Sequence, residues 1–209
     1  YCVPQLYWEI GNKAADYETL FKWWDKFASN RPLFIGESVD RTVKFTDVNN
    51  ASINQMPAKY QMHQNAKHTN GIVLWYSKAV VDNMGNYGDM LRNTYWRYPA
   101  LQPLMPFIDS HAPKKPRKLM VVNVNGERML FWTAPKGKAW NDVAAKYVVY
   151  RFNTDELINL NEPSKIVTVT YDNFCKLPYI DGKTKAVYVV TALDRMSNES
   201  KGKKKKIKL

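Results

Sequence analysis

The chain changes its hydrophobic period near residue 98. Before that point, short apolar runs alternate with stretches whose apolar side chains recur at helical spacing. Three apolar runs predict buried strands, at residues 3–8, 33–36 and 72–76. Each is followed by a predicted helix, at residues 17–24, 57–66 and 89–95. The alternation predicts a parallel α/β domain over residues 1–98, with a long polar loop at residues 40–55.

From Lys118 onward, apolar residues alternate with polar ones at a period of two, which is typical of strands. Six strands are predicted, at residues 119–124, 127–133, 146–152, 166–170, 185–193 and 203–209. Turn signals at Asn125-Gly126 and Asp181-Gly182 fall between strands of this set. This number of short strands in roughly 95 residues predicts a β-sandwich over residues 118–209.

Residues 99–117 join the two halves and contain five prolines without a sustained period. Pro-rich composition of this kind marks a domain boundary and a stiff linker. We expect the linker to be docked and ordered because it carries apolar side chains, those of Leu101, Leu104, Met105 and Phe107.

The net charge of +12 is concentrated in the second half of the chain. Residues 1–112 hold 11 Lys and Arg against 10 Asp and Glu, whereas residues 113–209 hold 20 against 9, which gives balances of +1 and +11. The basic half has two interpretations, a nucleic-acid patch or a solvated face with a Lys-rich final edge strand. The second is favoured because no aromatic residues are interleaved with the lysines near the end, so no nucleic-acid partner is expected.

Several classes of site are not indicated by the sequence. Cys2 and Cys175 lie in different predicted domains, so neither a disulfide nor a metal site is expected from them. His63 and His68 lack the i, i+4 spacing of a metal-binding pair on a helix. No glycine-rich nucleotide loop and no Gly-x-Ser-x-Gly motif occurs, so no cofactor is predicted. No apolar run approaches about 18 residues, so no transmembrane helix is predicted in this segment.

Two stretches near the start carry a resemblance to a known family. PQLYWEIG at residues 4–11 leads into an acidic and aromatic helix that ends in Trp23-Trp24, and RPLFIG follows at residues 31–36. This order resembles the later part of the barrel in the glycosyl-hydrolase-like 10 family. Members of that family are bacterial envelope proteins, some of which act on the glycan strands of peptidoglycan.

The resemblance has consequences for fold and location. It implies that residues 1–98 are the last three units of a (β/α)8 (TIM) barrel, whose first five units would precede Tyr1. The missing barrel half, or self-association, would then cover the open strand edges. The resemblance also implies a lipoprotein or periplasmic protein of the bacterial cell envelope, directed there by a signal upstream of this sequence.

The second half resembles a fibronectin type III domain. The resemblance rests on Leu130-Phe-Trp132, Tyr147-Val-Val-Tyr150 and Tyr188-Val-Val-Thr-Ala-Leu-Asp194, followed by Ser197-Asn-Glu-Ser200. The sequence departs from that pattern at Ala186, where an aromatic residue is expected.

Two carboxylates follow predicted strands of the first domain. Glu9 and Glu37 lie at strand carboxyl ends, where ligands of parallel α/β units bind. Because hydrolysis of a glycosidic bond needs one protonated and one ionised carboxyl group, both are catalytic candidates that could face one cleft. The alternative is that they form salt bridges or helix caps. In the family, the principal acids are expected on strands of the absent half, which would make Glu9 and Glu37 binding or supporting groups.

Aromatic side chains accompany these carboxylates. Trp8 and Trp75 end the first and third predicted strands, and a flat ring at a cleft can stack against the C–H face of a sugar. The alternative is that both rings fill the core of the barrel. The other candidates for binding a glycan are Gln5, Tyr7, Asp40, Tyr76 and Ser77.

The sequence therefore predicts the C-terminal fragment of a glycoside hydrolase acting on a cell-envelope glycan, such as peptidoglycan, or on another polysaccharide. Its carboxylate pair would lie mostly upstream, so these 209 residues are expected to be inactive alone. The alternative is a non-catalytic envelope module that binds glycan or protein.

Overall fold

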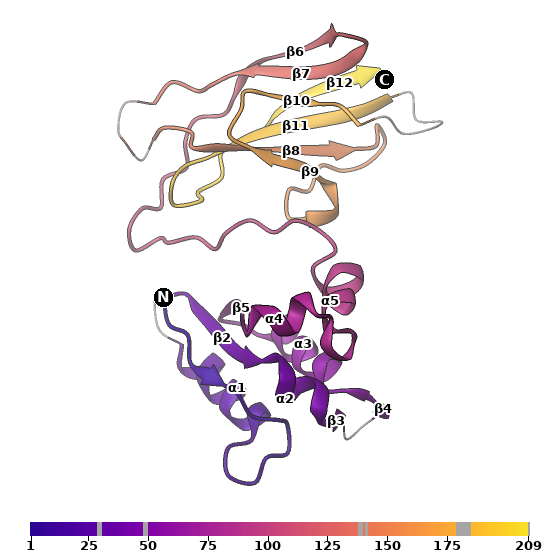
Figure 1. Ribbon diagram of the computed structural model, residues 1–209. Helices are drawn as coiled ribbons and strands as arrows, with labels where there is room; N and C mark the ends of the chain where they lie inside the picture. Colours follow the sequence, from indigo (N-terminus) through magenta and orange to yellow (C-terminus); the bar gives the residue numbers. More distant parts are fainter. Residues whose placement is uncertain (29–30, 48–49, 138–139, 141, 179–184, 209) are drawn as a thin grey trace. The chain divides into compact units, whose positions relative to one another are not determined.

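Two compact units make up the chain in the computed structural model, Tyr1–Arg97 and Tyr98–Leu209 (Figure 1). The structure describes residues 1–28, 31–47, 50–137, 140, 142–178 and 185–208. The turn predicted at Asp181-Gly182 lies outside these residues.

The first unit is built on a parallel sheet with the strand order β1-β2-β5. Its strands are β1 (Gln5–Leu6), β2 (Leu33–Ser38) and β5 (Thr69–Trp75). Leu6 pairs with Glu37, and Glu37 pairs with Leu74, so the carboxyl ends of all three strands meet at one edge of the sheet. The predicted parallel α/β arrangement is confirmed.

Helices cover one face of this sheet (Figure 1). They are α1 (Tyr17–Phe27), α2 (Val39–Lys44), α3 (Met56–Asn65), α4 (Ser77–Val81) and α5 (Tyr87–Met90), with a 3-10 turn at Met84–Asn86 and a π-helical turn at Leu91–Tyr95. Leu33 and Ile35 of β2 pack against Tyr17 and Phe21 of α1. Val73 belongs to the opposite face by strand alternation, and its side chain is exposed. The sheet is therefore buried on its helical face.

Three predictions for this unit are wrong. The strand at residues 3–8 shrinks to Gln5–Leu6, because β1 pairs with β2 alone and is an edge strand rather than a strand buried on both faces. Residues 40–55 are not a long loop, because the buried side chains of Val39 and Thr42 hold a helical turn against the sheet. That stretch also forms the antiparallel strands β3 (Thr46–Asp47) and β4 (Asn50–Asn54). The helix predicted at residues 89–95 begins earlier and changes to π-helical geometry, because Tyr87 anchors its start in the core.

The second unit is a β-sandwich, as predicted. One sheet has the order β10-β7-β6 and the other the order β12-β11-β8-β9. The strands are β6 (Arg117–Val124), β7 (Glu127–Thr133), β8 (Lys146–Phe152), β9 (Ile166–Thr170), β10 (Phe174–Lys176), β11 (Lys185–Leu193) and β12 (Lys203–Lys208), with a 3-10 turn at Pro163–Lys165. Asn125 and Gly126 both have positive φ, which suits the tight hairpin predicted between β6 and β7.

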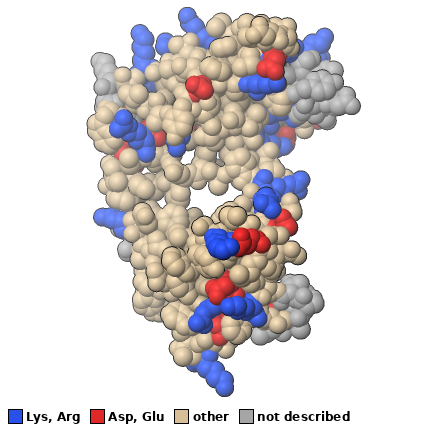
Figure 2. Space-filling view, in the orientation of Figure 1, with Lys and Arg blue, Asp and Glu red and all other residues tan. Residues whose placement is uncertain are grey.

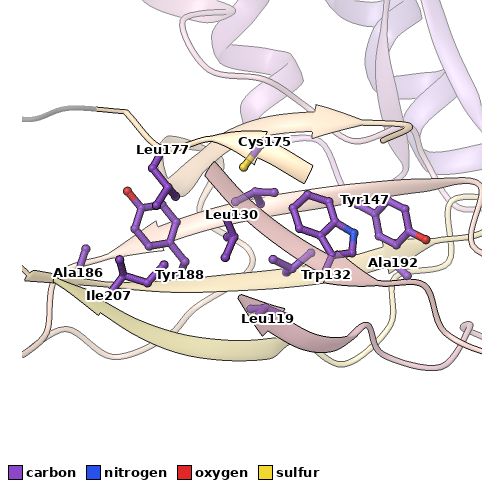
Figure 3. Packing of buried hydrophobic residues seen from close by; sticks show 12 residues of the cluster. Leu119, Leu130, Trp132, Tyr147, Cys175, Leu177, Ala186, Tyr188, Ala192 and Ile207 are labelled. Atoms are coloured by element: carbon purple, nitrogen blue, oxygen red, sulfur yellow. The ribbon is translucent and has the colours of Figure 1, made fainter. Parts of the chain in front are cut away.

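The sandwich core is formed by side chains from both sheets (Figure 3). Leu130 and Trp132 of β7 meet Tyr147 of β8 and Tyr188 of β11, and the rings of Trp132 and Tyr147 lie 5.4 Å apart in edge contact. Burial of these large side chains supplies the main favourable free energy of folding.

The Pro-rich stretch at residues 99–117 belongs to the second unit. Leu101 packs against a second apolar cluster on the four-stranded sheet, whose members include Val148 and Tyr150. The side-chain amide of Asn198 donates a 3.1 Å hydrogen bond to the Asp109 carbonyl. Among the side chains on which the expectation of a docked linker rests, Leu101 is packed, whereas Leu104 and Phe107 are exposed.

The lysines near the end of the chain lie on the edge strand β12. Lys203 to Lys206 are exposed, whereas Ile207 is buried. On the face seen in Figure 2, Lys and Arg side chains are spread over both units rather than gathered in one patch. A Lys-rich edge discourages pairing with other strands.

Candidate functional site

Three aromatic rings gather at the carboxyl edge of the parallel sheet, and we call Tyr7, Trp75 and Tyr76 the aromatic shelf. The rings of Tyr7 and Trp75 are nearly parallel, at 23° and 6.4 Å between centroids, and the ring of Tyr76 lies 6.2 Å from that of Trp75. Trp75 is 59% exposed. The exposed Trp75 ring, stacked on Tyr7, therefore presents a flat apolar surface to solvent at the sheet edge where ligands of parallel α/β units bind, and the Tyr76 ring is tilted by 55° beside it.

The sheet register explains why these rings meet. Ser38 of β2 pairs with Trp75 of β5, and Tyr7 follows β1 directly. Gly36 lies beside the Tyr7 ring, because a Cβ added at Gly36 would stand 3.5 Å from the Tyr7 Cε1 atom and 3.2 Å from the Pro4 carbonyl. The absence of a side chain at Gly36 thus lets the β1 segment approach β2 closely.

The structure places Glu37 away from this surface. Its side chain is 0% exposed and accepts hydrogen bonds from Tyr87 Oη at 2.8 Å and Thr42 Oγ1 at 3.0 Å. Tyr17 Oη lies 3.4 Å from the other carboxylate oxygen. Burial, together with the Glu37 charge, raises the pKa of Tyr17 and of Tyr87, so both phenols stay protonated and can donate. The expectation that Glu9 and Glu37 face one cleft is therefore not met for Glu37.

A buried lysine completes this network. Lys59 of α3 is 0% exposed, and its Nζ atom donates to Thr42 Oγ1 at 2.8 Å and to the Trp8 carbonyl at 3.2 Å. The ammonium also lies 4.2 Å from the centre of the Tyr17 ring. Burial lowers the pKa of Lys59, whereas the Glu37 charge acts in the opposite direction. We call Glu37, Lys59, Thr42, Tyr17 and Tyr87 the buried network.

The buried network holds the carboxyl edge of the sheet in place. Lys59 holds the backbone at Trp8, immediately after Tyr7 of the shelf, while Glu37 belongs to the strand beneath it. The ring of His63 extends the network, with Nε2 at 3.2 Å from Tyr17 Oη. Burial, and next the Lys59 charge, lower the pKa of His63 from 6.5 to about 4, so this imidazole is neutral near pH 7.

Glu9 lies closer to solvent than Glu37. Asn12 Nδ2 donates to its Oε1 atom at 2.7 Å, and Arg41 NH1 lies 3.8 Å from Oε2. Burial raises the pKa of Glu9, but hydrogen bonds from its own backbone and from Asn12, with the charges of Arg41 and Lys59, bring it below the usual 4.5. Glu9 is therefore ionised at neutral pH, which suits a binding group or base but not a general acid.

The remaining predicted residues lie around the shelf without joining it. Trp8 and Gln5 are exposed. Asp40, in the first turn of α2, accepts a short hydrogen bond from Ser38 and pairs with Lys44 at 3.3 Å. Ser77 is exposed at the start of α4.

Sequence reasoning missed Lys59, and its position contained a signal. Met56, Lys59, Tyr60 and His63 recur at helical spacing, and the first three are buried on one face of α3. A lysine on a buried helical face requires a partner, so the pattern pointed to a buried carboxylate. Glu37 also shares its strand face with Leu33 and Ile35, which alternation assigns to the helical side.

The described residues can also be searched for metal sites, free thiols and membrane-spanning helices. Across the described ranges, no three His, Cys, Asp or Glu side chains gather in a way that could hold a metal ion. Cys2 is exposed and Cys175 is buried, and both are free thiols. No helix among the described residues is long and apolar enough to cross a bilayer.

Comparison with known proteins links the chain to carbohydrate enzymes. The whole chain aligns at 28% identity with the glycosyl hydrolase YngK of Bacillus subtilis (strain 168), over 214 residues. The chain spans 41% of the length of that relative. No protein-family model matches the sequence. The chain is thus related over its full length to a protein named as a glycosyl hydrolase.

Solved structures give weaker likenesses. The glycoside hydrolase domain of Endo-D from Streptococcus pneumoniae R6 matches with 17% identity and a TM-score of 0.35, covering 48% of this chain and 16% of that one. The structure titled FN3tt matches with 17% identity and a TM-score of 0.35, covering 46% of this chain and 92% of that one.

Proposed function

We propose that this chain is part of a glycoside hydrolase in which the aromatic shelf forms one wall of the sugar cleft. The observation that carries the proposal is the placement of the exposed rings of Trp75 and Tyr76 at the carboxyl ends of parallel strands, with the half-buried Tyr7 ring stacked on Trp75. The relationship to a glycosyl hydrolase over the full chain supports it independently.

The parallel sheet favours an incomplete barrel. Parallel sheets are normally covered on both faces, and here the helices cover one face while Val73 on the other is exposed. The outer edges of β1 and β5 are unpaired among the described strands. These features suit the last units of a (β/α)8 barrel whose further strands come from elsewhere in a longer protein.

The roles of the residues follow from their surroundings. Trp75 stacks against a sugar ring, and Tyr7 holds Trp75 in place and offers its hydroxyl to the sugar. Glu9, being ionised, accepts hydrogen bonds from sugar hydroxyls. Glu37 acts as a structural anchor for the strand end rather than as acid or nucleophile, because solvent does not reach it. The acid and nucleophile then belong to other strands of the barrel.

The substrate in this proposal is a glycan of the bacterial cell envelope, such as peptidoglycan, and the protein is located in the periplasm or held by a lipid anchor. The resemblance of residues 4–11 and 31–36 to the glycosyl-hydrolase-like 10 family supports this part.

The test compares the 209 residues with the longer protein to which they belong. Release of reducing ends from peptidoglycan is measured for both, and activity is expected in the longer protein and absent in the isolated chain. Activity in the isolated chain would overturn the placement of the acids. Inactivity of the longer protein on peptidoglycan and on a panel of polysaccharides would overturn the hydrolase assignment and favour a binding module, for which the buried position of Glu37 is the supporting observation.

A further inference from the structure

We propose that the β-sandwich unit carries its own binding site for a carboxylate-bearing polysaccharide. A cavity of about 560 Å³ opens beside the start of β8, and Trp140, Lys146, Tyr171 and Arg195 line it. This volume lies in the range of roughly 300 to 1,000 Å³ that is usual for small-ligand sites. The site uses neither the residues nor the unit of the aromatic shelf, so the proposal stands apart from the proposed function.

Two aromatic rings at this cavity are turned to solvent. Trp140 is 60% exposed and Tyr171 is 74% exposed. Single exposed rings are common on protein surfaces, but two large exposed rings on the lining of one cavity are typical of a ligand site. A planar ring beside a hollow can stack against the apolar C–H face of a sugar while its hydroxyls stay hydrated.

Two cations select the charge of the ligand. Lys146 Nζ lies 5.4 Å from the centre of the Tyr171 ring, a cation–π contact that holds the ammonium at the cavity. Arg195 is exposed on the same lining. Among the described residues neither cation forms an ion pair with a carboxylate. A guanidinium binds a carboxylate through two parallel hydrogen bonds, which suits a uronic acid or another acidic sugar.

The acidic residue at the cavity offsets only part of this positive charge, because one carboxylate stands against two cations. Asp194 is buried, and its carboxylate accepts hydrogen bonds from the backbone N–H groups of Met196 and Asn198 and from the Asn198 side chain, at 2.8 to 2.9 Å. Those three bonds fix the turn that carries Arg195. The base of the cavity is also fixed, because the Ala145 N–H donates to the Leu193 carbonyl at 2.7 Å. The site is therefore preorganised for an anionic sugar.

Polygalacturonate, alginate and hyaluronate are suitable probes, each beside its carboxyl-reduced counterpart, with the complete 209-residue chain in a calorimeter. At least one of the three is expected to bind, and its reduced form is expected to bind at least about tenfold more weakly. Tyr171→Ala should weaken binding about three- to tenfold, as expected for the loss of one stacking ring. Arg195→Gln should weaken it by a similar factor.

Matched controls separate this site from general attraction to a basic protein. Phe174→Ala removes another exposed aromatic ring of this unit, and Lys204→Gln removes one positive charge from the edge strand β12. Neither should change affinity more than about twofold, and thermal unfolding should show all four variants folded. The proposal fails if none of the three polymers binds, if polyglutamate binds as tightly as they do, or if the control variants lose as much affinity as Tyr171→Ala and Arg195→Gln.

Discussion

The hydrogen bonds of the buried network should contribute strongly to the unfolding free energy of the first unit. The substitution Lys59→Met tests this contribution. Methionine preserves the length of the side chain and is a good helix former, so α3 itself should not be weakened. The change removes the donor to Thr42 Oγ1 and to the Trp8 carbonyl, and with it the positive charge that Thr42 links to the fully buried Glu37. Leaving these buried acceptors without their donor costs about 1 to 3 kcal/mol of unfolding free energy.

A double-mutant cycle apportions that cost. Glu37→Gln keeps an acceptor for the Tyr87 hydroxyl but removes the charge, and it should destabilise the unit to a similar degree. Because the double variant contains neither buried charge, its loss should fall short of the sum of the single losses by about 1 to 3 kcal/mol. Lys22→Met is the matched control, since Lys22 pairs with Glu18 on the exposed face of α1 and should change stability by less than about 0.5 kcal/mol.

The readout must report on the first unit alone, because a chain with two units does not unfold in one step. Hydrogen exchange of the amides in β2 and α3, followed by mass spectrometry, gives the opening free energy of that unit. The reasoning is refuted if Lys59→Met costs less than about 1 kcal/mol in these amides, or if the double variant loses the full sum of the single losses.

Three further predictions concern other parts of the molecule. The pKa of His63 is lowered from 6.5 to about 4, so the unfolded chain binds the proton more readily, and the first unit should lose stability as the pH falls through that interval. His63→Gln should flatten this fall when stability is measured by hydrogen exchange of the β2 and α3 amides; an unchanged pH dependence would contradict the burial of the ring. Gly202→Ala should destabilise the sandwich by about 1 to 3 kcal/mol in urea unfolding, because the added Cβ would stand 2.2 Å from Val189 Cγ1, and a loss below about 0.5 kcal/mol would contradict this packing. Gly126→Ala should cost about 1 kcal/mol, because Gly126 has φ near +84° in a turn with open space around it, and equal stability of variant and parent would argue against that turn.

The second unit was predicted closely because its signal is local. Alternation at a period of two predicts four strands whose bounds coincide with those in the structure. These strands are β7, β8, β9 and β11. Strand β10 was missed because Phe174–Lys176 is too short to show a period. It forms because the three residues pair with Met129 to Phe131 of β7, a contact between distant parts of the chain.

The first unit was predicted less completely because tertiary contacts decide its details. The strand ends correctly indicated that aromatic residues gather at one edge, since parallel strands bring their carboxyl ends together. The expectation that Glu37 faces a cleft is wrong because alternation along β2 puts its side chain on the same face as Ile35, beneath the helices. Helix α2 was missed because a six-residue helix has little intrinsic stability and depends here on burial of Val39 and Thr42.

The most direct test of the glycan cleft is the behaviour of the tryptophan indole N–H signals when glycan is added. The chain has seven tryptophans, each giving one such signal in an ¹⁵N–¹H correlation spectrum, and Trp23, which is exposed on α1, is an internal control for Trp75. On titration with soluble peptidoglycan glycan fragments and a panel of neutral oligosaccharides, at least one ligand should shift the Trp75 signal while the Trp23 signal stays in place. A Trp75 signal that is unmoved by every glycan, or that moves no more than that of Trp23, would contradict the assignment of the aromatic shelf to a sugar cleft.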